Sequence, residues 1–279
     1  MPDKVSPIEA LPAASRAYGE IGPRSSSPHW GMIVDQERCI GCWSCAVICK
    51  SENDIPLGSW WNRILTDGEA LDQPRSERGS LEMDWLPLAC QHCENAPCVK
   101  VCPVGATYHR DDGLVMQDND RCIGCRYCMI ACPYGVNFFN WKQPAENYYM
   151  DWSDPDIEAA SGGAVPPYRN PDLDGRYGSE QKQVAGGGHF RGIVEKCTFC
   201  VQRIEKGLQP ACVTVCPVQA LVFGDLDDQE SPISTYLTGK QTFRLLDEVG
   251  TEPRVHYVGG RPPGTRVREI EPVQGRVGA

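Results

Sequence analysis

The sequence contains 16 cysteines, and every one of them belongs to one of four groups of four. Thiolates are soft anionic ligands that suit iron–sulfur cores and zinc, and thiols can also pair as disulfides. Because no cysteine lies outside the groups, we interpret each group as one binding quartet. In chain order the candidate ligands are Cys39, Cys42, Cys45 and Cys49; Cys90, Cys93, Cys98 and Cys102; Cys122, Cys125, Cys128 and Cys132; and Cys197, Cys200, Cys212 and Cys216.

The spacing within the quartets favours 4Fe–4S clusters. The first and third quartets follow the pattern CxxCxxCxxxC, in which three thiolates surround one cluster and the fourth reaches the other cluster of a pair. Proline follows the last cysteine in three quartets, and Lys50 stands there in the first. Since every ligand position is a cysteine, the sequence predicts four 4Fe–4S clusters, with iron bound by all sixteen cysteines and no 3Fe–4S site.

Three other roles for the cysteines fit the spacing less well. Structural zinc is the strongest rival because CxxC pairs also build zinc ribbons, but CxxCxxCxxxC makes it difficult for one tetrahedral ion to collect four thiolates. A disulfide framework suits a small secreted chain, not one of 279 residues. Unliganded core cysteines would not fall into regular spacing. Iron–sulfur clusters are therefore the leading interpretation.

The quartets also reveal an internal repeat. The segment DQERCIGCWSCAVICK matches DNDRCIGCRYCMIACP, whereas APCVKVCPVGA matches PACVTVCPVQA. The order is thus A, B, A, B, which indicates a duplicated two-cluster unit.

Local patterns predict an α+β fold of two ferredoxin-like two-cluster units with short strands and helices, a long loop excursion and a C-terminal tail. A turn is expected at 111–113, and Ser231 followed by Pro232 resembles a helix start. The expected helices cover 44–50 and 127–131, and the expected strands cover 32–34, 107–109, 114–116, 137–140 and 254–258.

Composition divides the chain into five parts. The predicted organisation is a flexible arm over 1–29, an outer two-cluster unit over 30–84 and 185–230, an inner two-cluster unit over 85–140, an excursion over 141–184 and a tail over 231–279. No run approaches the 18 or so apolar residues of a membrane helix, and the first residues do not resemble a secretory signal. We expect a peripheral protein, held at either side of a membrane through its partners.

The remaining composition argues against nucleic-acid binding and against catalysis by this chain. The formal net charge of −10 disfavours a phosphate-binding surface. Neither a nucleophile–base arrangement nor a phosphate-binding glycine loop is present in the sequence. We therefore expect no catalytic residues, and we expect the chemistry to reside in a partner.

With these motifs, the chain resembles the four-cluster iron–sulfur, electron-transfer subunit of the dimethyl sulfoxide reductase superfamily, of the polysulfide, thiosulfate, tetrathionate and arsenate reductase and sulfite dehydrogenase type. The resemblance covers about residues 31–260 and rests on CIGCWSCAVICK, ACQHCENAPCVKVCPVGA, RCIGCRYCMIACPYGV, EKCTFCVQRIEKGLQPACVTVCPVQA and GTEPRVHYV. It implies a relay between a molybdenum or tungsten bis-pterin catalytic subunit and a quinone-reactive integral membrane subunit in anaerobic respiration.

The resemblance also implies which cysteines share a cluster. The last cysteine of each quartet is exchanged between the outer quartets and between the inner quartets. The implied sets are Cys39, Cys42, Cys45 and Cys216; Cys90, Cys93, Cys98 and Cys132; Cys122, Cys125, Cys128 and Cys102; and Cys197, Cys200, Cys212 and Cys49.

Two other functions fit the same cysteines. One is a free soluble polyferredoxin, and the other is the iron–sulfur subunit of a quinone-linked complex that lacks its own molybdoenzyme. The full-length resemblance favours the relay subunit over both.

Several residues near the quartets have simpler explanations than ligation. His92 lies inside a quartet that is complete without it, so loop packing or a hydrogen bond is expected. Arg126 is either a solvated charge or a group that raises the potential of a nearby cluster. Trp43 and Tyr127, the aromatic residues of matching loops, are expected to shield clusters, and Trp60 and Trp61 are expected in the core, with a partner-facing patch as the alternative.

Overall fold

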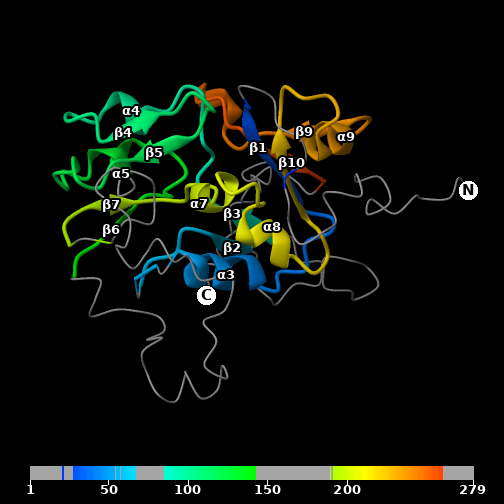
Figure 1. Ribbon diagram of the computed structural model, residues 1–279, viewed down its shortest axis with the longest axis horizontal. Helices are drawn as coiled ribbons and strands as arrows, with labels where there is room; N and C mark the ends of the chain where they lie inside the picture. Colours follow the sequence, from blue (N-terminus) through cyan, green and yellow to red (C-terminus); the bar gives the residue numbers. More distant parts are fainter. Residues whose placement is uncertain are drawn as a thin grey trace, which may run out of the picture.

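The computed structural model describes residue 21 and residues 28–53, 55–56, 58–66, 85–142, 189 and 191–259. Within these ranges the chain forms short helices joined by small sheets and cysteine-bearing loops (Figure 1). Nearly all of the predicted arm over 1–29, most of the predicted excursion over 141–184 and the end of the predicted tail lie outside the described residues.

A four-stranded sheet lies at the centre of the outer part. Its order is β8 (Leu221–Asp225), β1 (Trp30–Asp35), β10 (Val255–Val258) and β9 (Thr242–Phe243). Strand β1 pairs antiparallel with β8 and parallel with β10. All six residues of β1 are buried because the strand has a neighbour on each side and packed side chains on both faces.

Alternation along β1 divides its side chains between two cores. Trp30, Met32 and Val34 belong to the large core that also contains many of the cysteines. Ile33 faces the opposite way, into a small cluster with Val222 and residues of α9 (Pro232–Leu237). A shift of register by one residue would exchange the two sets.

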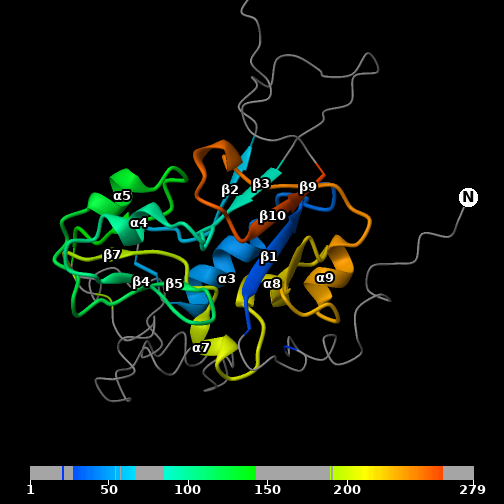
Figure 2. The ribbon, with the colours of Figure 1, turned by 90° about the horizontal axis from the view of Figure 1, so that it is seen from above.

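Two pairs of short helices pack together, and each pair joins an A quartet to a B quartet. Helix α3 (Ser44–Glu52) packs on α8 (Ala211–Val215), and α4 (Pro97–Lys100) packs on α5 (Tyr127–Ala131). A further helix, α7 (Val201–Ile204), follows the second cysteine of the fourth quartet. Figure 2 shows α4 and α5 on one side of the molecule and α3 and α8 nearer its centre.

Three two-stranded sheets complete the described fold, together with the 3-10 helix η4 (Asp247–Val249). The hairpin of β4 (Thr107–His109) and β5 (Val115–Gln117) lies within the inner unit. The other two sheets cross the predicted unit boundaries, because β2 (Arg63–Thr66) pairs with β3 (Trp85–Leu88) and β6 (Phe138–Phe139) pairs with β7 (Val194–Glu195). The two predicted units are therefore interlocked by backbone hydrogen bonds.

Most of the predicted elements are confirmed within a residue or two. The helix predicted over 127–131 is α5, and the helix predicted over 44–50 extends two residues further as α3. The strands expected at 32–34, 107–109, 114–116, 137–140 and 254–258 correspond to β1, β4, β5, β6 and β10. Part of the predicted tail contributes α9, β9 and β10, so it completes the central sheet.

Helix α9 begins where the sequence predicts, but its first hydroxyl has a different task. Ser231 is the N-cap residue and Pro232 opens the helix, yet the Ser231 side chain makes no capping hydrogen bond. Its Oγ instead accepts the backbone N–H of Asp225 at 3.0 Å. The serine thereby ties the start of α9 to the end of β8.

Replacing Ile33 by alanine tests the importance of the small core behind the central sheet. Ile33 is fully buried, whereas Ile130 on α5 is 82 % exposed. We expect Ile33→Ala to lower the free energy of unfolding by about 2–5 kcal/mol, because it removes methyl groups and leaves a cavity. Ile130→Ala should lower it by less than about 0.5 kcal/mol. Denaturant unfolding of both variants checks this, and equal losses would contradict it.

Candidate iron–sulfur cluster sites

All four quartets begin with the same backbone turn. The residue before the second cysteine has a positive φ in each case: 65° at Gly41, 44° at His92, 69° at Gly124 and 55° at Phe199. This left-handed conformation turns successive N–H groups to one side, which creates a concave site for an anion. Only the two glycines signal this turn in the sequence, so sequence reasoning missed it in the B quartets.

A second turn follows the last cysteine of three quartets. The third residue after it also has a positive φ, namely 63° at Gly105, 60° at Gly135 and 51° at Gln219. In two of these turns the next residue donates its N–H to the cysteine sulfur, at 3.2 Å from Ala106 to Cys102 Sγ and at 3.3 Å from Ala220 to Cys216 Sγ. Such bonds stabilise a thiolate and influence the potential of a bound cluster.

The first quartet is built differently because Lys50 replaces proline. Without proline, α3 continues to Glu52, and no such turn forms. The donor to sulfur is the side chain of Asn53, whose Nδ2 lies 3.7 Å from Cys49 Sγ and 3.7 Å from Cys200 Sγ. One amide thus joins thiols of the first and fourth quartets.

Lys50 itself is buried and organises the loop that follows α3. Its Nζ donates hydrogen bonds to the carbonyl oxygens of Pro56 at 2.9 Å and Ser59 at 2.8 Å. The ammonium also lies 4.8 Å from the ring centre of Trp60. The departure from proline therefore has a structural purpose, since it holds the 55–60 loop against α3.

In the outer quartets, the thiols affect one another across the repeat. Burial, followed by the nearby thiols of Cys216, Cys39 and Cys42, raises the pKa of Cys45 to about 12. Burial and the thiols of the fourth quartet, Cys197, Cys200 and Cys212, raise the pKa of Cys49 well above its ordinary value. Cys216 thus lies with the first loop, and Cys49 lies with the fourth quartet.

The inner quartets show the same exchange. Burial and the thiols of Cys90, Cys132 and Cys93 raise the pKa of Cys98 to about 12, although Lys196 opposes this. Burial and the thiols of Cys122, Cys102 and Cys125 raise the pKa of Cys128 to about 11. Each group of interacting thiols therefore contains three cysteines of one quartet and the last cysteine of another.

These groups fit a cationic iron core with sulfide bridges. Ionising four neighbouring thiols is unfavourable unless cations balance them, and bound iron would displace their protons. Buried donors are also available for sulfur, since within the described residues Thr198 Oγ1 has no hydrogen-bond partner. No three His, Cys, Asp or Glu side chains of the described ranges are grouped so that they could hold a single metal ion.

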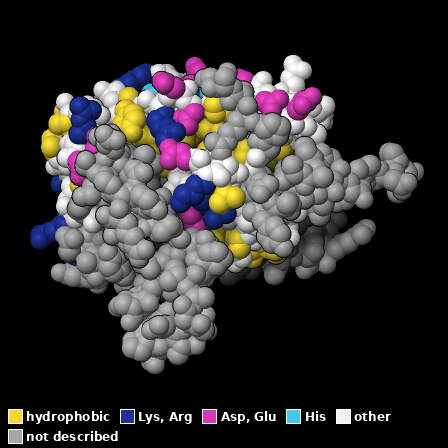
Figure 3. Space-filling view, in the orientation of Figure 1, with side chains coloured by type: hydrophobic (Ala, Val, Ile, Leu, Met, Phe, Trp, Pro, Cys, Tyr) yellow, Lys and Arg dark blue, Asp and Glu magenta, His cyan; other side chains and the backbone are white. Residues whose placement is uncertain are grey.

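Exposure differs between the two kinds of quartet. Cys90, Cys93 and Cys98 are buried, whereas Cys42 and Cys125 of the A loops are exposed. Large apolar side chains are exposed on and around the A loops: Ile40, Trp43, Val47, Leu65 and Val215 near the first, and Ile123, Tyr127, Ile130 and Trp141 near the third. On the face drawn in Figure 3, hydrophobic side chains lie between dispersed acidic and basic ones.

His92 has a structural role, as the sequence predicts. The side chain is fully buried, its Nδ1 accepts the N–H of Val115 at 3.1 Å, and its ring lies 3.9 Å from that of Phe199. Burial and the charge of Lys196 hold its pKa well below the ordinary value. A neutral ring that accepts at Nδ1 carries its proton on Nε2.

The aromatic residues of the A loops are half-exposed. The backbone equivalent of Trp43 in the third loop is Arg126, with φ 64° and 63°, and not the adjacent Tyr127. Trp43 meets Trp60 edge to face, and Arg126 lies over Phe139 and Trp141 at 5.3 and 4.9 Å. Trp61 is buried in the large core. An effect of Arg126 on a cluster potential stays a prediction.

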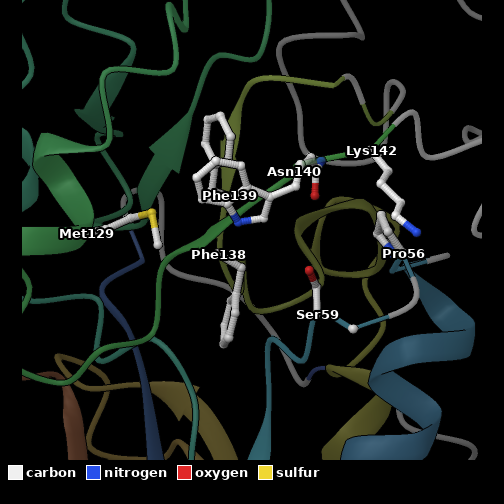
Figure 4. Close-up of a pocket in the computed structure, with 9 residues that line it drawn as sticks. Pro56, Ser59, Met129, Phe138, Phe139, Asn140 and Lys142 are labelled. Carbon is white, nitrogen blue, oxygen red and sulfur yellow. The ribbon is translucent and has the colours of Figure 1, made fainter.

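A separate pocket of about 360 Å³ lies beside α5. Figure 4 shows Met129, Phe138 and Phe139 along one side and Pro56, Ser59 and Lys142 along the other. Among its described lining residues, Lys142 is the one ionisable group. The pocket therefore offers no acid–base pair for catalysis.

Comparison with known proteins agrees with this geometry. A family described as a 4Fe-4S dicluster domain matches residues 81–148 and 188–226, and a second family of the same description matches residues 38–106. These two matches cover all sixteen cysteines.

Similar proteins extend over most of the chain. A dimethyl sulfoxide reductase iron–sulfur protein of Halobacterium salinarum, assigned as the iron–sulfur component of that reductase, is 48 % identical, covering 83 % of this chain and 79 % of its own. The arsenate respiratory reductase iron–sulfur subunit of Shewanella is 40 % identical (82 % and 95 %), and a selenate reductase subunit of Mesobacillus selenatarsenatis is 36 % identical (82 % and 71 %). The chain therefore belongs to the iron–sulfur, electron-transfer subunits of the dimethyl sulfoxide reductase superfamily and is not a catalytic subunit.

Proposed function

We propose that this chain relays electrons through four 4Fe–4S clusters between a molybdenum or tungsten bis-pterin catalytic subunit and a quinone-reactive membrane subunit. The observation that carries the proposal is the combination of four groups of interacting thiols with two exposed cysteine loops. When bound, each cluster takes up and releases one electron at a time. The protein's own residues hold, space and insulate the clusters.

The proposed ligand sets follow the groups of interacting thiols. Cluster 1 is held by Cys39, Cys42, Cys45 and Cys216; cluster 2 by Cys90, Cys93, Cys98 and Cys132; cluster 3 by Cys122, Cys125, Cys128 and Cys102; and cluster 4 by Cys197, Cys200, Cys212 and Cys49. The packing of α3 on α8 and of α4 on α5 supports the exchange, because each helix carries the last cysteine of its quartet or leads to it. These pairs define the two proposed two-cluster units.

Contacts between thiols of different sets suggest the order of the relay. Cys45 of the first set acts on Cys212 of the fourth, and Cys90 of the second set acts on Cys197 of the fourth. Sets 2 and 3 are joined by the exchange of Cys102 and Cys132. The proposed path is therefore cluster 1, cluster 4, cluster 2 and cluster 3, in either direction.

Clusters 1 and 3 form the proposed ends of this path. They are held by the exposed A loops, around which large apolar side chains such as Ile40 and Ile130 reach the surface. Exposed apolar patches mark sites of association, and electron transfer requires a partner close to the terminal cluster. No helix of the described residues is long and apolar enough to cross a membrane, so the proposed membrane attachment is peripheral and depends on a partner.

A second candidate keeps the relay and changes its partners. A menaquinone reductase iron–sulfur cluster-binding subunit of Nitratidesulfovibrio vulgaris is 32 % identical over 262 residues. That relative favours, as the alternative, a quinone-linked complex without a molybdoenzyme. A free polyferredoxin is the remaining alternative.

Anaerobic purification of the tagged protein from its own membranes separates these possibilities. We expect about sixteen iron atoms per chain, from four clusters of four, together with molybdenum or tungsten and a membrane subunit. Full iron with a quinone-reactive partner alone would favour the menaquinone-type complex. Full iron without partners would favour the polyferredoxin, and zinc in place of iron would contradict the cluster assignment.

Single cysteine replacements test the exchanged ligand sets. Cys216→Ala should abolish the same electron paramagnetic resonance signal as Cys39→Ala, because the two residues hold one cluster. Cys212→Ala, only four residues away, is the matched control and should abolish the signal that Cys49→Ala abolishes. Identical spectra for Cys212→Ala and Cys216→Ala would contradict the exchange.

Charged substitutions test the proposed docking patch at the third loop. Ile130 is 82 % exposed on α5, whereas Val249, 53 % exposed, lies on η4 away from both A loops. We expect Ile130→Lys to reduce recovery of one partner at least tenfold with iron content unchanged, since a charge placed in an apolar interface is desolvated without a partner. Val249→Lys should retain both partners, and retention of both by Ile130→Lys would argue against this patch.

A further inference from the structure

Lys196 is a buried cation at the junction between the two units. It directly precedes Cys197, and only 2 % of its surface is exposed. Its Nζ donates hydrogen bonds to the carbonyl oxygens of Val115, on β5 of the inner unit, and of Cys197, at 3.1 Å, in the outer unit. Both acceptors are neutral.

The other cations around this junction are balanced by carboxylates. Arg203 pairs with Glu52 at 3.3 Å, and Arg254 pairs with Glu94 at 2.6 Å. Across the part of the chain that the structure describes, no carboxylate forms an ion pair with Lys196. A buried charge without an opposite charge is costly, so the ammonium requires an anion that the side chains around it do not supply.

The neighbouring groups identify that anion. Lys196 lowers the pKa of Cys98, of the second set, and of Cys197, of the fourth set. The nearby His92 is neutral, and its Nδ1 accepts the N–H of the same Val115 whose carbonyl accepts from Lys196. Lys196 is therefore the positive charge that faces thiolates of both sets.

We propose that Lys196 is the shared counter-cation of clusters 2 and 4 and raises the reduction potential of both, so that electrons can cross between the units. This inference rests on the proposed cluster assignment. Reduction adds one negative charge to a cluster, and a fixed positive charge in a low-dielectric interior favours that reduced state. The hydrogen bonds of Lys196 to both units fix the position of the charge.

Potentiometric titration of the purified full-length protein, followed by electron paramagnetic resonance, tests the inference. In Lys196→Met, we expect two of the four midpoint potentials to fall so that the ratio of reduced to oxidised cluster at a fixed potential drops at least about tenfold, which is about 59 mV for one electron. Lys196→Arg, which keeps the charge, should stay near the wild-type potentials. Lys240→Met is the matched control, because Lys240 pairs with Asp35 at 3.3 Å outside the junction.

The possible results separate charge from shape. Unchanged potentials in Lys196→Met with full iron, or an equal fall in Lys240→Met, would overturn the inference. If Lys196→Met and Lys196→Gln lose clusters while Lys196→Arg keeps them, the requirement for charge is supported. Loss of clusters in all three variants would overturn it in favour of a space-filling role. A wild-type protein without four clusters would instead refute the proposed function.

Discussion

The structure depends on the crowding of thiols into buried groups of four. Neighbouring thiols raise one another's pKa, and burial raises it further, as at Cys45 and Cys98. Such groups are unfavourable as free thiolates and become favourable only around a cationic core. The N–H donors of Ala106 and Ala220, the Asn53 amide and the Lys196 ammonium all serve to stabilise negative charge at these positions. Most of the local structure is thus organised around charge that the polypeptide alone cannot balance.

The repeat explains why two kinds of loop occur and why they are not equivalent. The A loops use glycine for their first left-handed residue, and at Gly124 a Cβ would lie 2.0 Å from the carbonyl oxygen of Gly192. The B loops place His92 and Phe199 in that conformation, and the two rings pack together. Because these rings meet at the centre, the B quartets are buried and the A quartets are left at the surface. Duplication therefore produces a molecule with an interior middle and two accessible ends.

Much of this arrangement could be predicted from the sequence, and the rest could not, for identifiable reasons. The cysteine spacing, the A, B, A, B order and elements such as α5 and β4 depend on local pattern, and each is read from a short segment. The parallel pairing of β1 with β10 and the sharing of Cys49 and Cys200 by Asn53 depend on contacts between distant segments. The sequence also placed Lys50 as a departure without indicating its bonds to Pro56 and Ser59. Nothing in the residues around Lys196 marks it as buried.

The pairing of β1 has a consequence for how the protein is made. Both neighbours of this first strand, β8 and β10, come from the last third of the described chain, and α3 likewise waits for α8. The elements of the inner unit, α4, α5 and the β4–β5 hairpin, lie close together in the sequence and have their main partners at hand as soon as they leave the ribosome. Domains generally form as their segments are synthesised. The earliest segment to emerge is thus among the last to be completed, and the first cysteine loop stays open to cluster delivery until synthesis has nearly ended.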